Sequence, residues 1–261
     1  MTGAERLVWD EKYHGVARGE ALARIRDAGR MGIIRAVVPF LRPGGRVLEA
    51  GSGTGRLVSH LALEREVRGV GLDYSWQANL GAAQSARAVG ARTTFVSGDL
   101  VHLPFPSDDF DLVFSDSVIE HLADPLAAVA EMARVVRPGG HVIVTTPNRL
   151  RPDGWDLYKL RYRPQYLQRS FFPWQLGRML AACDLTVERY FGDTLLIPRN
   201  FRLRAVRRGT ASRKAGPPAP ARKSWGLYWR AERAAERVLP STMWVNIGVV
   251  ARKPPAVTRA C

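Results

Sequence analysis

A strand, a glycine loop and the start of a helix follow one another in the stretch Arg46-Val-Leu-Glu-Ala-Gly-Ser-Gly-Thr-Gly-Arg56. Its first residues predict a buried strand that ends in the carboxylate of Glu49. The loop glycines are Gly51, Gly53 and Gly55. Glycine lets the backbone turn tightly and approach a ligand without a Cβ clash. Apolar residues at helical spacing begin at Leu57, so the first N–H groups of that helix would point at whatever fills the loop.

A second apolar strand, from Val67 to Leu72, ends in Asp73, whose carboxylate suits ribose hydroxyls. The dinucleotide fingerprint needs its third glycine where this chain has Arg56, and no Gly-Lys-Ser/Thr follows to make a phosphate-binding loop. A carboxylate beside the loop repels a pyrophosphate but suits a ligand with an ammonium and a sulfonium group. S-adenosylmethionine therefore fits this pocket better than NAD or ATP.

The next residues continue the alternation of strands and helices. Strands are expected at residues 92–96, 110–115 and 141–146. Asp124-Pro125 opens a helix, as its N-cap and first residue, and this helix is expected to end at Arg137. Pro138-Gly-Gly then separates it from the following strand. The alternation predicts a doubly wound α/β sheet.

In this order of motifs the chain resembles the class I S-adenosylmethionine-dependent methyltransferases. Within them it looks most like the branch with the ubiquinone- and menaquinone-biosynthesis methyltransferases. The resemblance is strong over residues 40–150 and weaker over 170–192 and 243–253. It implies a Rossmann-like, doubly wound α/β fold with a seven-stranded sheet and an antiparallel last strand. Residues 185–190 and 243–251 are then expected to form the antiparallel edge pair.

Four segments are expected along the chain. They are a helical lead-in or lid at 1–42, the cofactor-binding core at 43–198, a basic insertion at 199–242, and the last strand with a tail at 243–261. The lead-in contains a helical pattern from Glu20 to Leu41, and a second helix is expected from Gln175 to Ala182.

The resemblance assigns roles around the methionine part of the cofactor. Gly51, Ser52, Gly53 and Gly55 would hold the methionine moiety, and Glu49 would lie near its amino group. Ser115, at the end of the fourth strand, would lie beside the same moiety.

The resemblance also assigns the adenosine side of the pocket. Asp73 would take the ribose hydroxyls, with Tyr74 next to it. Asp99 would accept a hydrogen bond from the adenine amino group, and Leu100 would cover the ring. S-adenosyl-L-methionine is therefore the expected cofactor.

His121 is the residue best placed to take a proton from a hydroxyl or phenol acceptor. It lies six residues past Ser115 on the lip of the pocket, and histidine titrates near neutral pH. A structural role in starting a helix or in packing is the alternative. The ubiquinone O-methyltransferases have a Glu-x-x-Glu-His run here that is associated with a divalent metal. Ser117 replaces the first glutamate, so we expect no metal site.

Positive charge is concentrated near the C-terminal end of the chain. The 261 residues carry a net charge of +15, and residues 201–223 contain 8 basic residues and no acid. An amphipathic, aromatic helix is expected from Trp225 to Leu239. We expect residues 201–239 to make peripheral contact with an anionic membrane, or else to form a solvated loop and a helix over the substrate pocket.

These patterns predict a methyltransferase that acts on a small-molecule or lipid-linked acceptor, with O-methylation favoured. The alternatives are an RNA methyltransferase, suggested by a pI near 10.8, and a cofactor-binding protein without turnover. Against RNA, the fourth strand ends in Ser115-Asp-Ser and lacks the Asn/Asp-Pro-Pro-Tyr/Phe signature of base-amino methylation.

The expected location is the cytoplasm, with peripheral contact at the inner face of the membrane. No run of 18 apolar residues exists, the first residues lack the apolar core of a signal peptide, and the chain has two cysteines. The acceptor and the oligomeric state stay open at this stage.

Overall fold

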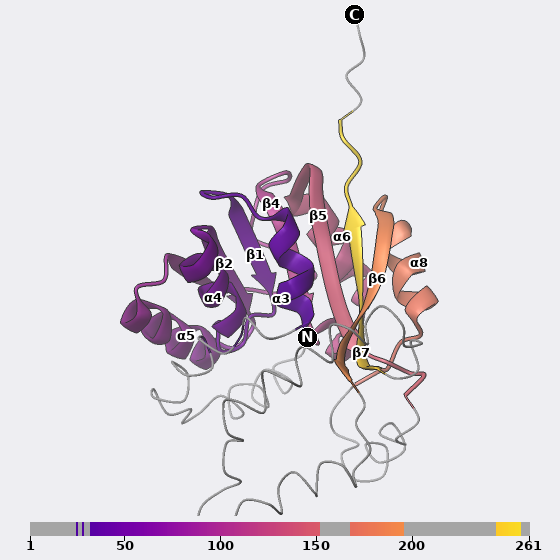
Figure 1. The fold of residues 1–261 in the computed structure, drawn as a ribbon, viewed down its shortest axis with the longest axis horizontal. Helices are drawn as coiled ribbons and strands as arrows, with labels where there is room; N and C mark the ends of the chain where they lie inside the picture. The colour runs from indigo at the N-terminus through magenta and orange to yellow at the C-terminus, as the bar shows by residue number, and fades with distance from the viewer. Residues whose placement is uncertain (1–24, 26–27, 29–31, 152–167, 196–243, 257–261) are drawn as a thin grey trace, which may run out of the picture.

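The computed structural model of the chain describes residues 25, 28, 32–151, 168–195 and 244–256. One sheet runs through all of the described part, with helices on both faces (Figure 1). Its strands are β1 (Arg46–Ala50), β2 (Arg68–Asp73), β3 (Thr93–Ser97), β4 (Phe110–Asp116), β5 (Val136–Pro147), β6 (Thr186–Leu195) and β7 (Trp244–Arg252). The α-helices are α3 (Gly32–Val37), α4 (Arg56–Arg65), α5 (Trp76–Val89), α6 (Pro125–Val135) and α8 (Pro173–Ala181). Two short 3₁₀ turns, η2 (Val38–Phe40) and η3 (Ile119–His121), complete the elements used below.

The strand order confirms the expected fold. The seven strands lie in the order β3-β2-β1-β4-β5-β7-β6. Strands β1 to β5 pair in parallel, whereas β7 runs antiparallel to both β5 and β6. The reversal of the winding falls between β1 and β4, where Leu48 pairs with Val113. In open α/β sheets this switch point is where ligands bind, outside the carboxyl ends of the strands.

Two apolar cores flank the sheet. On one face α3 and α4 pack against the strands through Ile33, Val37, Leu57 and Leu61, all at most 2% exposed. On the other face α6 and α8 do so through Met132, Leu176 and Leu180, all 0% exposed. Each such side chain removed from water contributes about 1.5–3 kcal/mol. The cores therefore hold the strand ends at fixed places, and the site is built on those ends.

One boundary differs from its expected place. Helix α6 ends at Val135 rather than at Arg137, and β5 begins at once with Val136 instead of at residue 141. Val136 already pairs with Phe110, and the regular pairing resumes only at His141 with Leu112. Pro138-Gly-Gly therefore forms an irregularity inside the start of the strand, which the strand pairing across the sheet stabilises.

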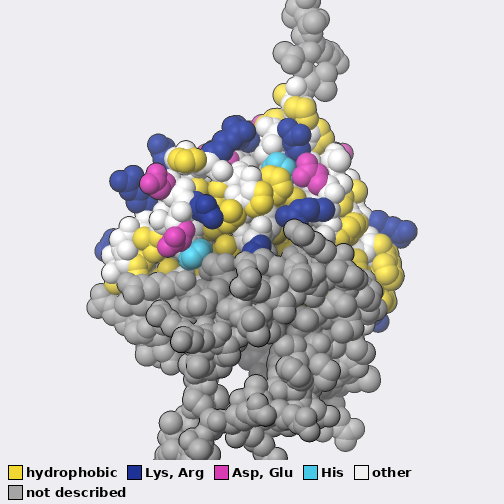
Figure 2. Space-filling model, in the orientation of Figure 1, with side chains coloured by type: hydrophobic (Ala, Val, Ile, Leu, Met, Phe, Trp, Pro, Cys, Tyr) yellow, Lys and Arg dark blue, Asp and Glu magenta, His cyan; other side chains and the backbone are white. Residues whose placement is uncertain are grey.

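Several expected features lie outside the described residues. These are most of the lead-in before residue 32, the basic insertion at 199–242 with its amphipathic helix, and the tail after residue 256. In the described part, Lys and Arg side chains are interspersed with acids and apolar residues on the face drawn in Figure 2. No helix in this part is long and apolar enough to cross a membrane.

Candidate active site

The glycine loop between β1 and α4 has a shape that only glycine adopts easily. Gly51, Gly53 and Gly55 have φ angles of +84°, +50° and +65°. The N–H groups of Gly51 and Ser52 both donate to the carbonyl of Leu72 at the end of β2, at 2.7 and 2.9 Å. A Cβ on Gly51 would lie 2.5 Å from Val118, in the loop that follows β4. The loops after β1, β2 and β4 thus meet here, at the switch point.

Glu49 closes the inner end of this loop. Its side chain is buried, and its Oε2 accepts a hydrogen bond from the Val58 N–H in the first turn of α4 at 2.9 Å. Burial raises the pKa of Glu49 well above its ordinary value; the Val58 bond lowers it, and Asp116 and Asp73 raise it further. A cation placed beside Glu49 would relieve the cost of ionising this carboxyl group.

Asp73 ties the glycine loop to the next strand and helix. Its Oδ2 accepts from the Gly53 N–H at 2.7 Å, and its Oδ1 accepts from the Ser75 N–H at 2.9 Å. Ser75 in turn caps α5 by accepting from the Ala78 N–H. Each carboxylate oxygen can accept more than one hydrogen bond, so Asp73 keeps acceptor capacity for a diol. Tyr74 follows directly and is partly exposed.

Asp99 and Leu100 form a tight turn after β3. Asp99 Oδ1 accepts from the Val101 N–H at 3.2 Å, and its carbonyl accepts from the His102 N–H at 3.1 Å. Leu100 is only 4% exposed, because its side chain belongs to the core that contains Leu72. The turn lies after the carboxyl end of β3, where the adenine side of the pocket was expected.

Ser115 joins the ends of β4 and β1. Its side chain is 0% exposed, and its hydroxyl donates to the carbonyl of Ala50 at 2.8 Å. It therefore lies beside the glycine loop, and its hydroxyl proton is used in a hydrogen bond within the protein. Ser52 differs: its buried hydroxyl has no hydrogen-bond partner among the described residues, so this loop atom can serve a ligand.

Asp116 belongs to the same site, and sequence reasoning missed it as a site residue. Thr145 donates a hydrogen bond to Asp116 Oδ1 at 2.6 Å, across the pair β4 and β5. Burial raises the pKa of Asp116, while the Thr145 bond and the charge of Arg56 lower it. The signal was its place at the carboxyl end of β4, next to the switch point. Glu49, Asp73 and Asp116 thus place carboxyl groups around the glycine loop.

His121 lies at the end of η3, after the residues that pack on the glycine loop. Its Nε2 is 4.0 Å from Oε1 of Glu120, whose side chain is fully buried, while the His121 side chain is 17% exposed. The Arg169 N–H donates to the Glu120 carbonyl at 3.0 Å, which fixes this turn against the segment before α8. In the described ranges, no group of three or more His, Cys, Asp or Glu could hold a metal ion.

Comparison with known proteins agrees with this geometry. Residues 48–144 match a family described as Methyltransferase domain. A probable S-adenosylmethionine-dependent methyltransferase of Mycolicibacterium smegmatis is 40% identical over 104 residues, which are 40% of this chain and 38% of that protein. A ubiquinone biosynthesis O-methyltransferase of Vibrio cholerae serotype O1 is 33% identical over 107 residues, 41% of this chain and 43% of that protein.

A solved structure resembles nearly the whole chain. It is the methyltransferase in complex with the Haloferax volcanii Trm112 methyltransferase activator, with a TM-score of 0.64 and 18% identity. The match covers 94% of this chain and 97% of that one. At this identity the likeness shows the fold alone, whereas the family match is confined to residues 48–144, which carry the glycine loop. The sheet, the glycine loop and the match of residues 48–144 to a methyltransferase domain support a class I S-adenosylmethionine-dependent methyltransferase, and the chain spans less than half the length of these two relatives.

Proposed function

We propose that this chain transfers the methyl group of S-adenosylmethionine to a small-molecule acceptor, and that O-methylation is favoured. The observation that carries the proposal is the set of carboxyl groups of Glu49, Asp73 and Asp116 around a glycine loop at the switch point. Such a set repels pyrophosphate and attracts the positive charges of an ammonium and a sulfonium group.

The residues present fit this cofactor. The buried Glu49, whose pKa is raised, gains a cation partner, and the buried Ser52 hydroxyl gains a hydrogen-bond partner. Asp73 would accept from the ribose hydroxyls and Asp99 from the adenine amino group. When bound, the cofactor supplies an electrophilic methyl group on a sulfonium whose leaving thioether needs no proton. The protein's main task is then to orient the acceptor and to exclude water.

On the acceptor side, we assign His121 the role of taking the proton of a hydroxyl or phenol. Its ring lies on η3, which follows the Val118 side chain that packs on Gly51. The O-methyltransferase relative supports oxygen as the methylated atom. We also propose that the acceptor can be lipid-linked and that the protein is cytoplasmic. We propose peripheral contact with an anionic membrane through residues 201–239, which lie outside the described ranges.

Binding and transfer can be measured separately. Calorimetry should show binding of S-adenosylmethionine and S-adenosylhomocysteine but not of NAD. Asp73→Ala should weaken this binding by about 1–3 kcal/mol, which is about 5- to 150-fold in Kd, because charge-assisted hydrogen bonds are lost. Tight binding of NAD without binding of S-adenosylmethionine would contradict the proposal.

Tritium transfer from labelled S-adenosylmethionine into fractionated small-metabolite, lipid and RNA pools identifies the acceptor class. Label in the small-metabolite or lipid pool is the expected result. Label in the RNA pool alone would replace the small-molecule proposal by RNA methylation. Cofactor binding without label in any pool would favour a binding protein without turnover.

A further inference from the structure

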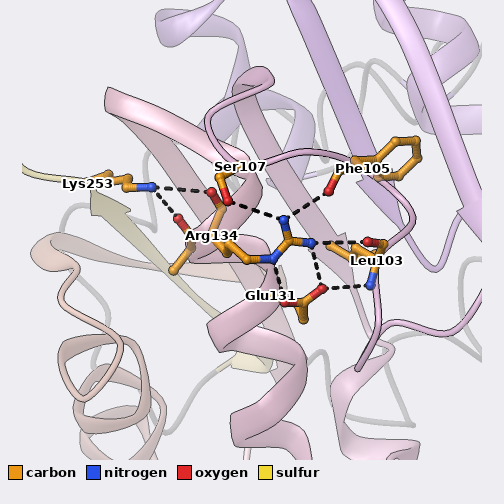
Figure 3. Close-up of polar contacts among 7 residues, drawn as sticks. Leu103, Phe105, Ser107, Glu131, Arg134 and Lys253 are labelled. Atoms are coloured by element: carbon orange, nitrogen blue, oxygen red, sulfur yellow. Dashed lines mark hydrogen bonds and ion pairs between the residues drawn. The ribbon is translucent and has the colours of Figure 1, made fainter.

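Glu131 and Arg134, two side chains of α6, hold the segment between β3 and β4 in place. Glu131 Oε2 accepts a hydrogen bond from the Leu103 N–H at 2.8 Å. The Arg134 guanidinium donates to the carbonyl of Leu103 at 3.1 Å, to the carbonyl of Phe105 at 2.9 Å and to Ser107 Oγ at 3.4 Å. Figure 3 shows both side chains reaching from the helix toward this segment. The N–H of Leu103 and the carbonyls of Leu103 and Phe105 are thus all hydrogen-bonded to side chains of α6.

All three guanidinium nitrogens of Arg134 donate hydrogen bonds in this arrangement. In addition to its bonds with the loop, its Nε donates to Glu131 Oε1 at 2.6 Å and its Nη2 to Glu131 Oε2 at 2.8 Å. A guanidinium has five N–H donors in a rigid geometry, which the ammonium group of lysine cannot reproduce. The hydrogen bond from Arg134 is the largest of the effects that lower the pKa of Glu131. The pair is therefore charged at neutral pH.

The place of this pair suggests more than stabilisation of the fold. The side chain of Arg134 is 35% exposed and that of Glu131 is 21% exposed. Ion pairs at such exposure add little to the free energy of unfolding. Their bonds to main-chain atoms instead fix the path of the loop. This path begins one residue after the turn of Asp99, in which Asp99 Oδ1 accepts from the Val101 N–H and the Asp99 carbonyl from the His102 N–H.

We propose that Glu131 and Arg134 are positioning residues for adenine recognition. By anchoring Leu103 and Phe105 they set the direction of the Asp99 turn, and through it the carboxylate that accepts from the 6-amino group of adenine. This inference rests on the proposed function of the site. The pair does not touch the cofactor, but it sets the selectivity for a purine with a 6-amino donor over one with a 6-oxo acceptor.

Lys253 provides a matched control on the same helix end. Its Nζ donates to Asp108 Oδ1 at 2.7 Å, to the carbonyls of Ala133 and Val136, each at 2.8 Å, and to the main-chain carbonyl of Arg134 at 3.3 Å. Among the residues that the structure describes, it has no hydrogen bond to residues 103–105. Lys253→Met should therefore loosen the end of α6 without releasing the loop.

The test compares S-adenosylhomocysteine, whose purine has a 6-amino donor, with S-inosylhomocysteine, whose purine has a 6-oxo acceptor and a proton on N1. Wild type should prefer the 6-amino ligand by about tenfold, the value of one charge-assisted hydrogen bond. This ratio should fall to about twofold in Glu131→Ala and in Arg134→Lys, because the Asp99 turn loses its anchor. Lys253→Met should keep the wild-type ratio within about twofold, because in the described part of the chain Lys253 has no hydrogen bond to residues 103–105. Calorimetry below the measured Tm of each variant gives all the ratios.

Each outcome decides a different question. If wild type binds neither ligand, the proposed function itself fails. If wild type discriminates and the Glu131 and Arg134 variants discriminate equally well, the positioning role is wrong. It is also wrong if Lys253→Met loses the ratio as fully as they do, or if wild type binds both ligands equally. Should Glu131→Ala not fold, Glu131→Gln and Arg134→Lys carry the same comparison.

Discussion

The cofactor side of this molecule and the side where we propose that the acceptor binds differ in how far apart in the sequence their contacting residues lie. The cofactor side, residues 46–105, consists of β1 to β3 with α4 and α5, each joined to the next by a short connection. Its key contacts are local or cross one strand pair, such as the Gly53 N–H with Asp73 and the Val58 N–H with Glu49. A short sequence is enough to specify such a site.

The other half of the sheet, where we propose that the acceptor binds, joins distant parts of the sequence. Strand β7 enters between β5 and β6, where Val249 pairs with Val144 and with Tyr190. The connections at 152–167 and 196–243, which lie beside this pairing in sequence, are outside the described residues. The comparison teaches that the contacts around the glycine loop join residues close in sequence, whereas the pairing of β5, β6 and β7 joins residues far apart in sequence.

The largest effect is expected at the centre of the cofactor side, for Gly51→Ala. Alanine at φ +84° is strained, and its Cβ would lie 2.5 Å from Val118. Together these should cost roughly 2–4 kcal/mol of unfolding free energy and lower cofactor affinity at least about 100-fold. Denaturant unfolding and calorimetry measure the two effects.

Gly44→Ala is the matched control for Gly51→Ala. Gly44 has a similar φ of +73°, but an added Cβ meets nothing within 4 Å. This variant should lose only about 1–2 kcal/mol and bind the cofactor normally. Equal effects of the two substitutions on binding would mean that backbone strain, rather than the fit of the glycine loop, determines affinity.

A smaller effect is expected on the acceptor side, for His121→Ala. If this ring takes the acceptor's proton, kcat should fall about 100-fold while the Kd for S-adenosylhomocysteine changes little. Single-turnover kinetics with a phenolic or hydroxylic acceptor, together with calorimetry, separates the two quantities. Near-normal turnover in the folded variant would reduce His121 to a packing residue at the end of η3.

The contrast between the two sides also explains what the sequence could predict. The glycine loop and Asp73 at the end of the second strand were expected because turn chemistry and strand periodicity are local, whereas the seven-stranded sheet with its antiparallel last strand was expected from the family resemblance. Asp116 was not predicted as a site residue, because its role depends on the hydrogen bond from Thr145, which lies 29 residues later in the chain. The hydrogen bonds of Glu131 and Arg134 to the loop before β4 escaped for the same reason.

The helix boundary at Val135 shows the limit of local signals in another way. Pro138-Gly-Gly is a strong break by composition, yet Val136 already pairs with Phe110 in the sheet. Tertiary pairing overrides the local signal there. Likewise the strand pattern of residues 185–190 continues to Leu195, because β7 pairs along the whole length of β6.

The smallest and most specific effect is expected for Glu49→Gln, which removes a charge but keeps an acceptor for the Val58 N–H. The folded protein raises the pKa of Glu49, chiefly by burial, with Asp116 and Asp73 adding to the rise and the Val58 bond and Arg56 opposing it. The folded state therefore binds this proton more tightly than the unfolded chain. The stability from Glu49 is present below its ordinary pKa and is lost as pH rises through the raised one.

Glu49→Gln should accordingly raise the Tm of the unliganded protein at neutral pH, and the gain should disappear at acidic pH. The same variant should bind S-adenosylmethionine more weakly, because the ammonium group loses its carboxylate partner. In wild type, affinity should increase as pH rises through the pKa of Glu49, since binding favours the ionised form. The ligand's own titration is common to both proteins, so the difference between their pH profiles isolates Glu49. Parallel profiles would show that Glu49 only caps α4 and does not face the cofactor's amino group.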